Sequence, residues 1–310
     1  MPEKNQKYSF KAMIRVVAFA AAVLFTISVF GTNVLATERG GGCYPNGVEG
    51  IMLGVMPPPG LYYLNYSLYY SADRMNDSDG DKLPVDLDLD MIANVSRFVY
   101  VTEYRMLGAN YGMYVTIPLL SVDVSLDTPG GNFDDSSSGL GDVTVSPMML
   151  SWHSKNIHTA AAFQITAPIG QYDAKSRANT GRNYWMLESI LATTLLTDNG
   201  LELSTKFMYD INSENNDTHY KSGQEFHFDY ATAYHMGFWA YGITGYFYKQ
   251  VSDDGGTGAV DGNRGQAFAA GPAIWYKHKN MSFEARYQKE MLVENRPEGE
   301  KFWLKVIWAF

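Results

Sequence analysis

The last ten residues of the chain alternate between two kinds of side chain, and this alternation strongly constrains the fold. The odd-numbered residues form one parity of the strand and include Lys301 and Lys305. The even-numbered residues form the other parity, which is wholly apolar and consists of Phe302, Leu304, Val306, Trp308 and Phe310. Alternate side chains of a strand point to opposite faces, and a lysine facing lipid at mid-membrane costs about 2–4 kcal/mol. We therefore expect the apolar parity to face lipid and the lysines to face a barrel interior.

Segments with the same two-residue period recur from residue 61 to the end of the chain. Most are longer than the roughly five or six residues of strands in soluble proteins, and they suit the about 9–11 residues that cross a membrane. The predicted strands are residues 61–71, 86–101, 106–119, 140–152, 157–168, 184–197, 201–212, 223–235, 238–250, 265–277, 281–292 and 300–310.

Long polar connections alternate with short turns, so all long connections fall at one end of the predicted strands. Bacterial outer-membrane barrels have this asymmetry, with an even strand number, short periplasmic turns and both termini in the periplasm. The sequence predicts an all-β, transmembrane, antiparallel up-and-down β-barrel of about 12 strands, closed by the last strand beside the first. The longer connections are residues 72–85, 120–139, 169–183, 213–222, 251–264 and 293–299.

Two segments precede the predicted barrel of residues 61–310. Residues 1–36 combine four basic residues, an apolar run over 16–30 and small residues before position 37, which indicates a cleaved signal peptide. Residues 37–60 are rich in glycine and proline, and the prolines at 57–59 cannot donate sheet hydrogen bonds. We expect this second segment to be an N-terminal lead or a plug at the periplasmic mouth.

Charge and composition indicate the partners. The net charge of −9 disfavours nucleic acid, and the 22 tyrosines suit the aromatic girdles of a barrel in the bacterial outer membrane. The expected partners are outer-membrane lipid and lipopolysaccharide, a small hydrophobic or aromatic solute, and the barrel-insertion machinery, which would read the strand ending at Phe310. We expect a monomer.

Placing the apolar parity outward leaves a set of polar residues as candidates for lining a pore. They form either a structural network that fills the barrel or a permeation path that binds the polar end of a ligand. Tyr63, Tyr69, Tyr114 and Tyr184 are expected to face inward with them. The pore-lining candidates are Asp86, Asp88, Asp90, Asp142, Glu202, Lys206, Asp210, Glu225, His227, Asp229, Glu284, Arg286, Glu290, Lys301 and Lys305.

The sequence indicates neither an enzyme nor a metal or cofactor site. No motif ties a serine to the strand histidines His158, His227 and His235. Residues 77–81 resemble a calcium loop only in part, because the glycine lies one residue before the third acid. We expect no catalytic residues, no metal and no cofactor.

Several short segments, taken in order, resemble the MetA-pathway phenol-degradation (SphA-like) family of outer-membrane transporters. They span residues 44–62, 107–118, 139–147, 168–172, 212–223, 271–272 and 295–297, and so cover nearly all of the chain after residue 36. The resemblance implies a channel that takes up small hydrophobic or aromatic compounds for catabolism, and it offers no catalytic residues. The alternative is a non-transporting barrel that binds a lipid or ligand at its outer loops.

Overall fold

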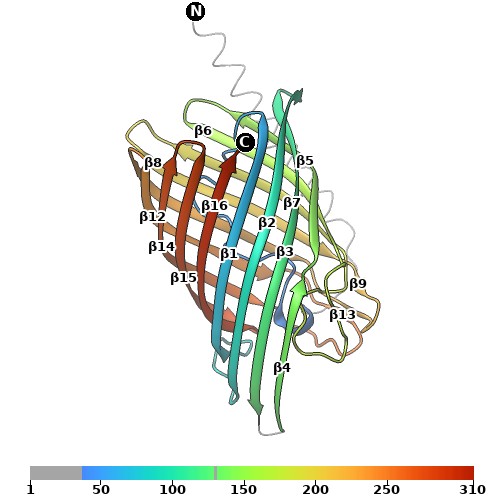
Figure 1. Ribbon diagram of the computed structural model, residues 1–310. Coiled ribbons are helices and arrows are strands. Elements are labelled where there is room, and N and C mark those ends of the chain that lie inside the picture. The colour runs from blue at the N-terminus through green and yellow to red at the C-terminus, as the bar shows by residue number, and fades with distance from the viewer. Residues whose placement is uncertain (1–36, 129–130) are drawn as a thin grey trace, which may run out of the picture. The chain divides into compact units, whose positions relative to one another are not determined.

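The computed structural model describes residues 37–128 and 131–310, so the expected signal peptide lies outside the described residues. Long strands, joined in sequence order, form one continuous wall (Figure 1). The elements are η1 (Glu38–Gly40), β1 (Gly60–Met75), β2 (Asp86–Met106), β3 (Ala109–Thr128), β4 (Gly131–Leu140), β5 (Val143–His153), β6 (Ile157–Ala167), β7 (Met186–Leu196), β8 (Leu201–Asn212), β9 (Glu214–Asn215), β10 (Tyr220–Lys221), β11 (Glu225–Met236), β12 (Trp239–Gln250), β13 (Gly255–Gly256), β14 (Gln266–His278), β15 (Met281–Glu294) and β16 (Pro297–Ala309).

Twelve strands close into an antiparallel ring. The ring order is β1, β2, β3, β5, β6, β7, β8, β11, β12, β14, β15 and β16, and β16 pairs back onto β1 with Tyr62 opposite Ala309. Each of the twelve predicted segments corresponds to one of these strands. The predicted fold class is therefore confirmed, including closure by the terminal strand.

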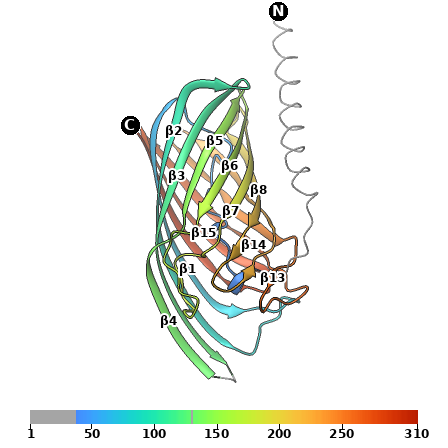
Figure 2. The ribbon, with the colours of Figure 1, turned by 90° about the vertical axis from the view of Figure 1, so that its right-hand side faces the viewer.

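The two ends of the ring differ in the length of their connections. The end formed by short turns, here called the turn end, includes the hairpin between β2 and β3, where Leu107 and Gly108 have φ of 54° and 75°. Positive φ at both central residues is the geometry of a two-residue type I′ turn. The longer connections gather at the opposite loop end, which carries the small sheet of β9, β10 and β13 (Figure 2).

The predicted connection over residues 120–139 is largely strand, which corrects the expectation of a loop. β3 continues to Thr128 and pairs with β4 beyond the point where its pairing with β5 ends. The paired strands β2, β3 and β4 thus project past the ring at the loop end (Figure 1). Their extra length lies outside the stretch in which the ring is closed.

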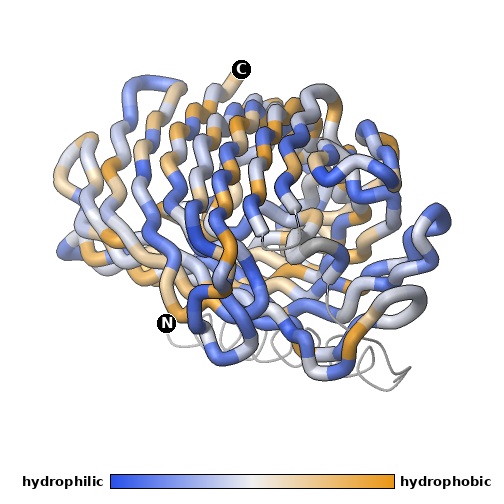
Figure 3. The backbone as a smooth tube through the Cα atoms, turned by 90° about the horizontal axis from the view of Figure 1, so that it is seen from below, coloured by the Kyte–Doolittle hydropathy of each residue, from blue (hydrophilic) through white to orange (hydrophobic). Residues whose placement is uncertain are grey.

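The outer face of the ring is apolar where the terminal strand predicts it. Phe302 and Leu304 are each 46% exposed, whereas Lys301 and Lys305 are buried. Hydrophobic and hydrophilic residues alternate along the strands (Figure 3). The face assigned to β16 from sequence is confirmed. Within the described ranges, no helix is long and apolar enough to cross a membrane.

An arginine placed at Leu304 should lower the free energy of unfolding in lipid vesicles by about 2–4 kcal/mol, because it would face hydrocarbon near mid-strand. Leu201 provides the control, because it is exposed and is the first residue of β8, at the turn end of the ring. Leu201→Arg should cost about 0–1 kcal/mol near the interface. Equal costs for the two variants, measured by denaturant titration, would contradict this assignment of the lipid-facing wall.

Candidate functional site

Residues 37–59, here called the inner segment, run inside the barrel from its loop end to its turn end. At the loop end the amide of Thr37 donates to the Oε1 atom of Gln250 at 3.2 Å. At the turn end the carbonyl of Pro58 accepts a hydrogen bond from the hydroxyl of Tyr62 at 2.8 Å. The segment therefore follows the length of the lumen and is not confined to the periplasmic mouth.

Side chains of the barrel wall bind the backbone of the inner segment. Asp229 accepts hydrogen bonds from the amides of Gly47 at 2.9 Å and Glu49 at 3.2 Å, and from the hydroxyl of Tyr44 at 3.2 Å. Buried amides need such acceptors, because the segment has no neighbouring strand inside the ring. Further contacts of this kind join Ile51 to Glu284 at 3.0 Å, Met52 to Glu202 at 2.6 Å and Gly54 to the hydroxyl of Thr194 at 2.9 Å.

Most of the pore-lining candidates lie inside the barrel, although many of them contact the inner segment or one another. Asp142 is half-buried at the loop end, where it accepts the amides of Gly170 at 2.9 Å and Arg182 at 2.6 Å. The candidates that are buried in the interior are Glu202, Lys206, Asp210, Glu225, His227, Asp229, Glu284, Arg286, Glu290, Lys301 and Lys305.

Asp86, Asp88 and Asp90 lie on the outer face of β2, so the inward placement expected for them is wrong. The neighbouring Leu87 is buried, and Asp90 accepts a hydrogen bond at 2.9 Å from Tyr69, which is 46% exposed. Asp86 and Asp88 belong to the part of β2 that projects past its pairing with β1, and Asp90 lies at the end of that pairing, opposite Ser71. A carboxylate facing outward there does not face the hydrocarbon of a membrane, so the rule that charged parities point inward does not apply.

The tyrosines expected to face inward divide between the two faces. Tyr114 and Tyr184 are buried in the interior. Tyr69 and Tyr63 lie on the outer face, and the Tyr63 hydroxyl is 2.9 Å from Ser96 on the outer side of β2. On β1 it is the other parity, which includes Tyr66, that faces the lumen.

The interior wall has an apolar side and a charged side. The charged side is formed by β8, β11, β15 and β16, which carry the buried candidates, and by β7, which carries the buried Glu188. The apolar side is formed by β1, β2 and β3, whose inward residues are Tyr62, Leu64, Tyr66, Leu68, Tyr70, Leu87, Ala93, Val95, Val99, Val101 and Tyr114.

Arg97 is a charged residue on the otherwise apolar side. With Glu49 of the inner segment it forms a cluster that was not predicted from the sequence. Arg97 Nη1 is 2.8 Å from Glu49 Oε1, and Lys206 Nζ is 3.2 Å from the same atom. The hydroxyl of Tyr66 lies 3.3 Å from Glu49 Oε2. Arg97 itself could have indicated this cluster from the sequence, because it is the one charged residue on the inward parity between Leu87 and Val101.

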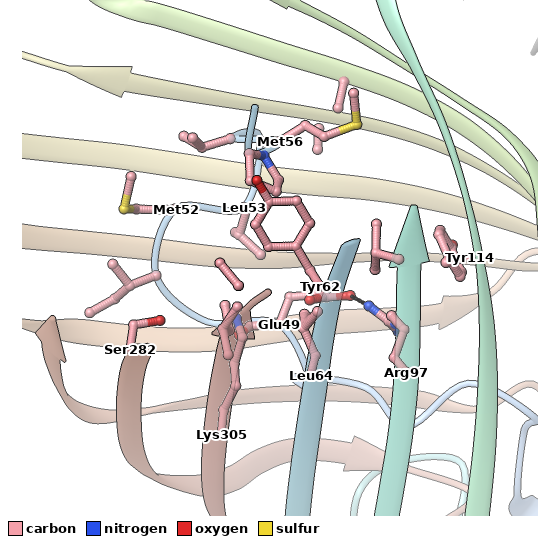
Figure 4. A pocket seen from close by; sticks show the side chains of 18 of the residues that line it. Glu49, Met52, Leu53, Met56, Tyr62, Leu64, Arg97, Tyr114, Ser282 and Lys305 are labelled. Atoms are coloured by element: carbon pink, nitrogen blue, oxygen red, sulfur yellow. Dashed lines mark hydrogen bonds and ion pairs between the residues drawn. The ribbon is translucent and has the colours of Figure 1, made fainter. Parts of the chain in front are cut away.

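Two cavities adjoin this cluster, one on each side along the barrel. The turn-end cavity has a volume of about 510 Å³ and is lined by Met52, Leu53, Met56, Tyr62, Leu64 and Tyr114, with Glu49 and Arg97 at its floor (Figure 4). The loop-end cavity has a volume of about 350 Å³ and is lined by Leu68, Tyr70, Ala93, Val95 and Leu120, again with Arg97. Along β1 and β2 the linings occupy successive inward positions on either side of Tyr66 and Arg97. The cavities therefore meet end to end at the Glu49 cluster.

On the charged side, Glu188, Asp210 and His227 form the group of described residues that is close enough to hold a metal ion. All three are buried, and His227 Nε2 lies 3.0 Å from Asp210 Oδ2 and 3.9 Å from Glu188 Oε2. The ring of Tyr44 covers His227, with centroids 4.8 Å apart. The imidazole is hydrogen-bonded to a carboxylate, as buried polar groups in a barrel interior must be.

Replacing Asp229 by alanine should loosen the inner segment. Two buried amides and the Tyr44 hydroxyl would lose their acceptor, and each unpaired buried group costs about 1–3 kcal/mol. We expect faster hydrogen exchange at the amides of Gly47 and Glu49. Asp88→Ala, which removes an exposed carboxylate of β2, is the control and should leave that exchange unchanged. Unaltered exchange in Asp229→Ala would contradict the role given to this carboxylate.

The loop-end attachment of the inner segment should depend on pH through Asp254. This carboxyl accepts the Gly223 amide at 2.5 Å and the Gln250 side-chain amide at 2.9 Å, and Gln250 binds Thr37. Burial raises the pKa of Asp254 from 3.8 to about 7. The folded state therefore keeps a proton that the unfolded chain has lost, and stability falls as pH rises from about 4 to about 7.

We expect the amide of Gly223 to be less protected from exchange at pH 8 than at pH 5, after correction for intrinsic rates. Asp254→Asn should abolish this difference. Identical protection at both pH values in the unaltered chain would show that Asp254 is not protonated in the folded state.

One solved outer-membrane channel is similar in fold over most of the chain. The COG4313 outer membrane channel from Pseudomonas putida F1 has a TM-score of 0.73 at 16% identity, over 84% of this chain and 98% of that one. The β domain of the Bordetella autotransporter BrkA reaches a TM-score of 0.47 at 10% identity, over 81% of this chain and 99% of that one. No curated protein matches the chain in sequence.

The first of these likenesses shows a shared fold with an outer-membrane channel. A closed ring with an apolar outer wall has no unpaired strand edge, which is the condition for crossing a membrane with strands. The chain is thus a bacterial outer-membrane barrel. Residues 72–306 match the family described as "Putative MetA-pathway of phenol degradation", and the chain belongs to that family.

Proposed function

We propose that the barrel is an outer-membrane channel for the uptake of small hydrophobic or aromatic compounds that feed catabolism. The observation that carries the proposal is the apolar side of the lumen. Its two cavities follow β1, β2 and β3 from the loop end to the turn end, and both fall in the range of about 300–1,000 Å³ that suits small-molecule sites. Residues of the charged side also line both cavities, Lys206 and Lys305 at the turn end and Glu290 and Lys301 at the loop end, so an apolar solute would lie against the wall of β1, β2 and β3.

The inner segment acts, in this proposal, as the plug of the channel. It lies between the apolar and charged sides, and its Glu49 separates the two cavities. Gly50 has φ of +98°, and a Cβ at this position would collide with the Arg286 guanidinium and the Glu284 carboxylate. Only glycine at position 50 lets the segment lie in this position. This is what we expect of a plug that is held in one defined place.

Gly50→Ala should therefore unseat the plug and raise the rate at which a neutral phenol-like compound enters proteoliposomes, by several-fold over the unaltered chain. Gly237→Ala is the matched control. Gly237 also has positive φ, at +62°, but it lies in a turn where a Cβ would meet nothing within 4 Å. It should alter folding slightly and uptake not at all.

Equal uptake by vesicles with and without the protein would overturn the channel proposal. Binding of the compound without uptake would instead favour the alternative of a ligand-binding barrel that does not transport. A rise in uptake for both glycine variants would show that backbone strain in general, and not release of the inner segment, opens the barrel.

A further inference from the structure

Two buried cations of the lumen depend on the inner segment for their negative partner. Arg97 and Lys206 are 12% and 7% exposed in their side chains, and among the described residues each forms its ion pair with Glu49. Arg97 also lies over the rings of Tyr66 and Tyr114, at 5.1 and 5.0 Å from their centroids. These ring contacts accompany the ion pair but bring no negative charge.

Three other buried cations have partners on the wall itself. Arg286 Nη1 lies 3.1 Å from Glu284, and Lys305 Nζ lies 3.6 Å from the same carboxylate. Lys301 Nζ lies 3.2 Å from Glu290. These pairs would persist if the inner segment left the lumen. Arg97 would then lose its carboxylate partner among the described residues, and Lys206 would keep only carboxylates at longer range, among them Asp229, which lies opposite it on β11.

A buried charge that loses its partner is strongly unfavourable, so departure of Glu49 requires either water or another anion at the same place. The surroundings favour an anion with an apolar body. Cavities with an apolar wall on β1, β2 and β3 extend from Arg97 on both sides, and the aromatic rings of Tyr66 and Tyr114 flank its guanidinium. Arginine also binds carboxylates with directed N–H groups, which makes it suited to hold one among apolar walls.

We propose that Arg97 and Lys206 form a carboxylate-binding site for the solute, and that Glu49 is its built-in occupant. The solutes would be amphipathic carboxylates, with an aromatic or medium-chain aliphatic body lying in the apolar cavities. A bound solute replaces Glu49, keeps both cations paired and so lowers the cost of moving the inner segment. This inference rests on the proposed function and narrows its substrate class.

The test compares carboxylates with neutral molecules of the same shape on the full-length protein in detergent. Calorimetry would measure binding of 4-phenylbutyrate and octanoate against 4-phenylbutanol and octanol. Glu49→Gln removes the carboxylate that occupies the site. The affinity of this variant for the carboxylates should therefore rise at least tenfold, while its affinity for the alcohols stays the same. Glu300→Gln, which removes an exposed carboxylate paired with Lys289, is the control and should bind as the unaltered chain does.

Arg97→Gln should abolish the preference of the Glu49→Gln protein for carboxylates over alcohols. Equal affinities of Glu49→Gln for acids and alcohols would overturn the proposal. If Glu49→Gln fails to fold, hydrogen exchange in the unaltered chain tests the proposal instead. Octanoate, and not octanol, should speed exchange at the amides of Glu49 and Ile51, and equal exchange with both ligands would overturn the proposal.

The outcomes also separate this inference from the channel proposal. Uptake of neutral compounds without any preference for carboxylates would overturn the inference alone. Tight carboxylate binding by Glu49→Gln without uptake of any compound would support the site and overturn transport.

Discussion

Closure of twelve strands into a ring is the constraint on which the rest of this structure depends. About eight strands make a barrel that its own side chains can fill, and a ring of twelve encloses more space than that. Residues 37–59 occupy the additional space as irregular backbone. Such backbone carries amides and carbonyls that need partners, and inward-facing side chains supply those that turns within the segment leave unpaired. The buried carboxylates of the wall therefore serve first as acceptors for the inner segment.

The charged and apolar sides of the lumen follow from this requirement. The inner segment lies against the side where Asp229, Glu284 and Glu202 meet its amides. This side also carries cations that pair with some of its acids: Arg286 and Lys305 lie beside Glu284, and Lys301 lies beside Glu290. The opposite side makes fewer such contacts, among them the hydrogen bond from the Tyr62 hydroxyl to the Pro58 carbonyl, and its inward residues are mostly apolar. The result is a lumen in which an apolar surface and a set of ion pairs face each other across the inner segment.

The Glu49 cluster contacts both sides of the lumen and lies between its two cavities. Glu49 comes from the segment, Arg97 from the apolar wall and Lys206 from the charged wall. The pairing fixes the depth at which the segment lies, and it divides one apolar surface into two cavities. A single carboxylate thus serves both packing and the proposed selection of solutes. This explains why a charged residue occurs on an inward parity that is otherwise apolar.

Inspection of the sequence correctly predicted the features that depend on local periodicity. The face of β16 was assigned correctly because its lysines and its apolar residues fall on opposite parities, so only one orientation avoids placing charge in lipid. The same reasoning failed on β2. Asp86 and Asp88 lie where the strand has already left the ring, and Asp90 lies at the loop end of its pairing with β1, so their charge says nothing about the lipid-facing side. On β1 both parities carry large apolar side chains, and periodicity by itself cannot choose between lipid and an apolar lumen.

The sequence by itself determined the number of strands and their alternation of short turns and long connections, because each depends on residues close together in the chain. Closure by the terminal strand followed from the even number of strands and the alternating connections, since these bring the last strand back beside the first. Only the tertiary structure decided the path of the inner segment and the partners of Glu49. Those contacts join residues 48 and 157 positions apart. They exist because the ring leaves a space that a distant segment must fill, and no local pattern specifies which inward charge a segment will meet there.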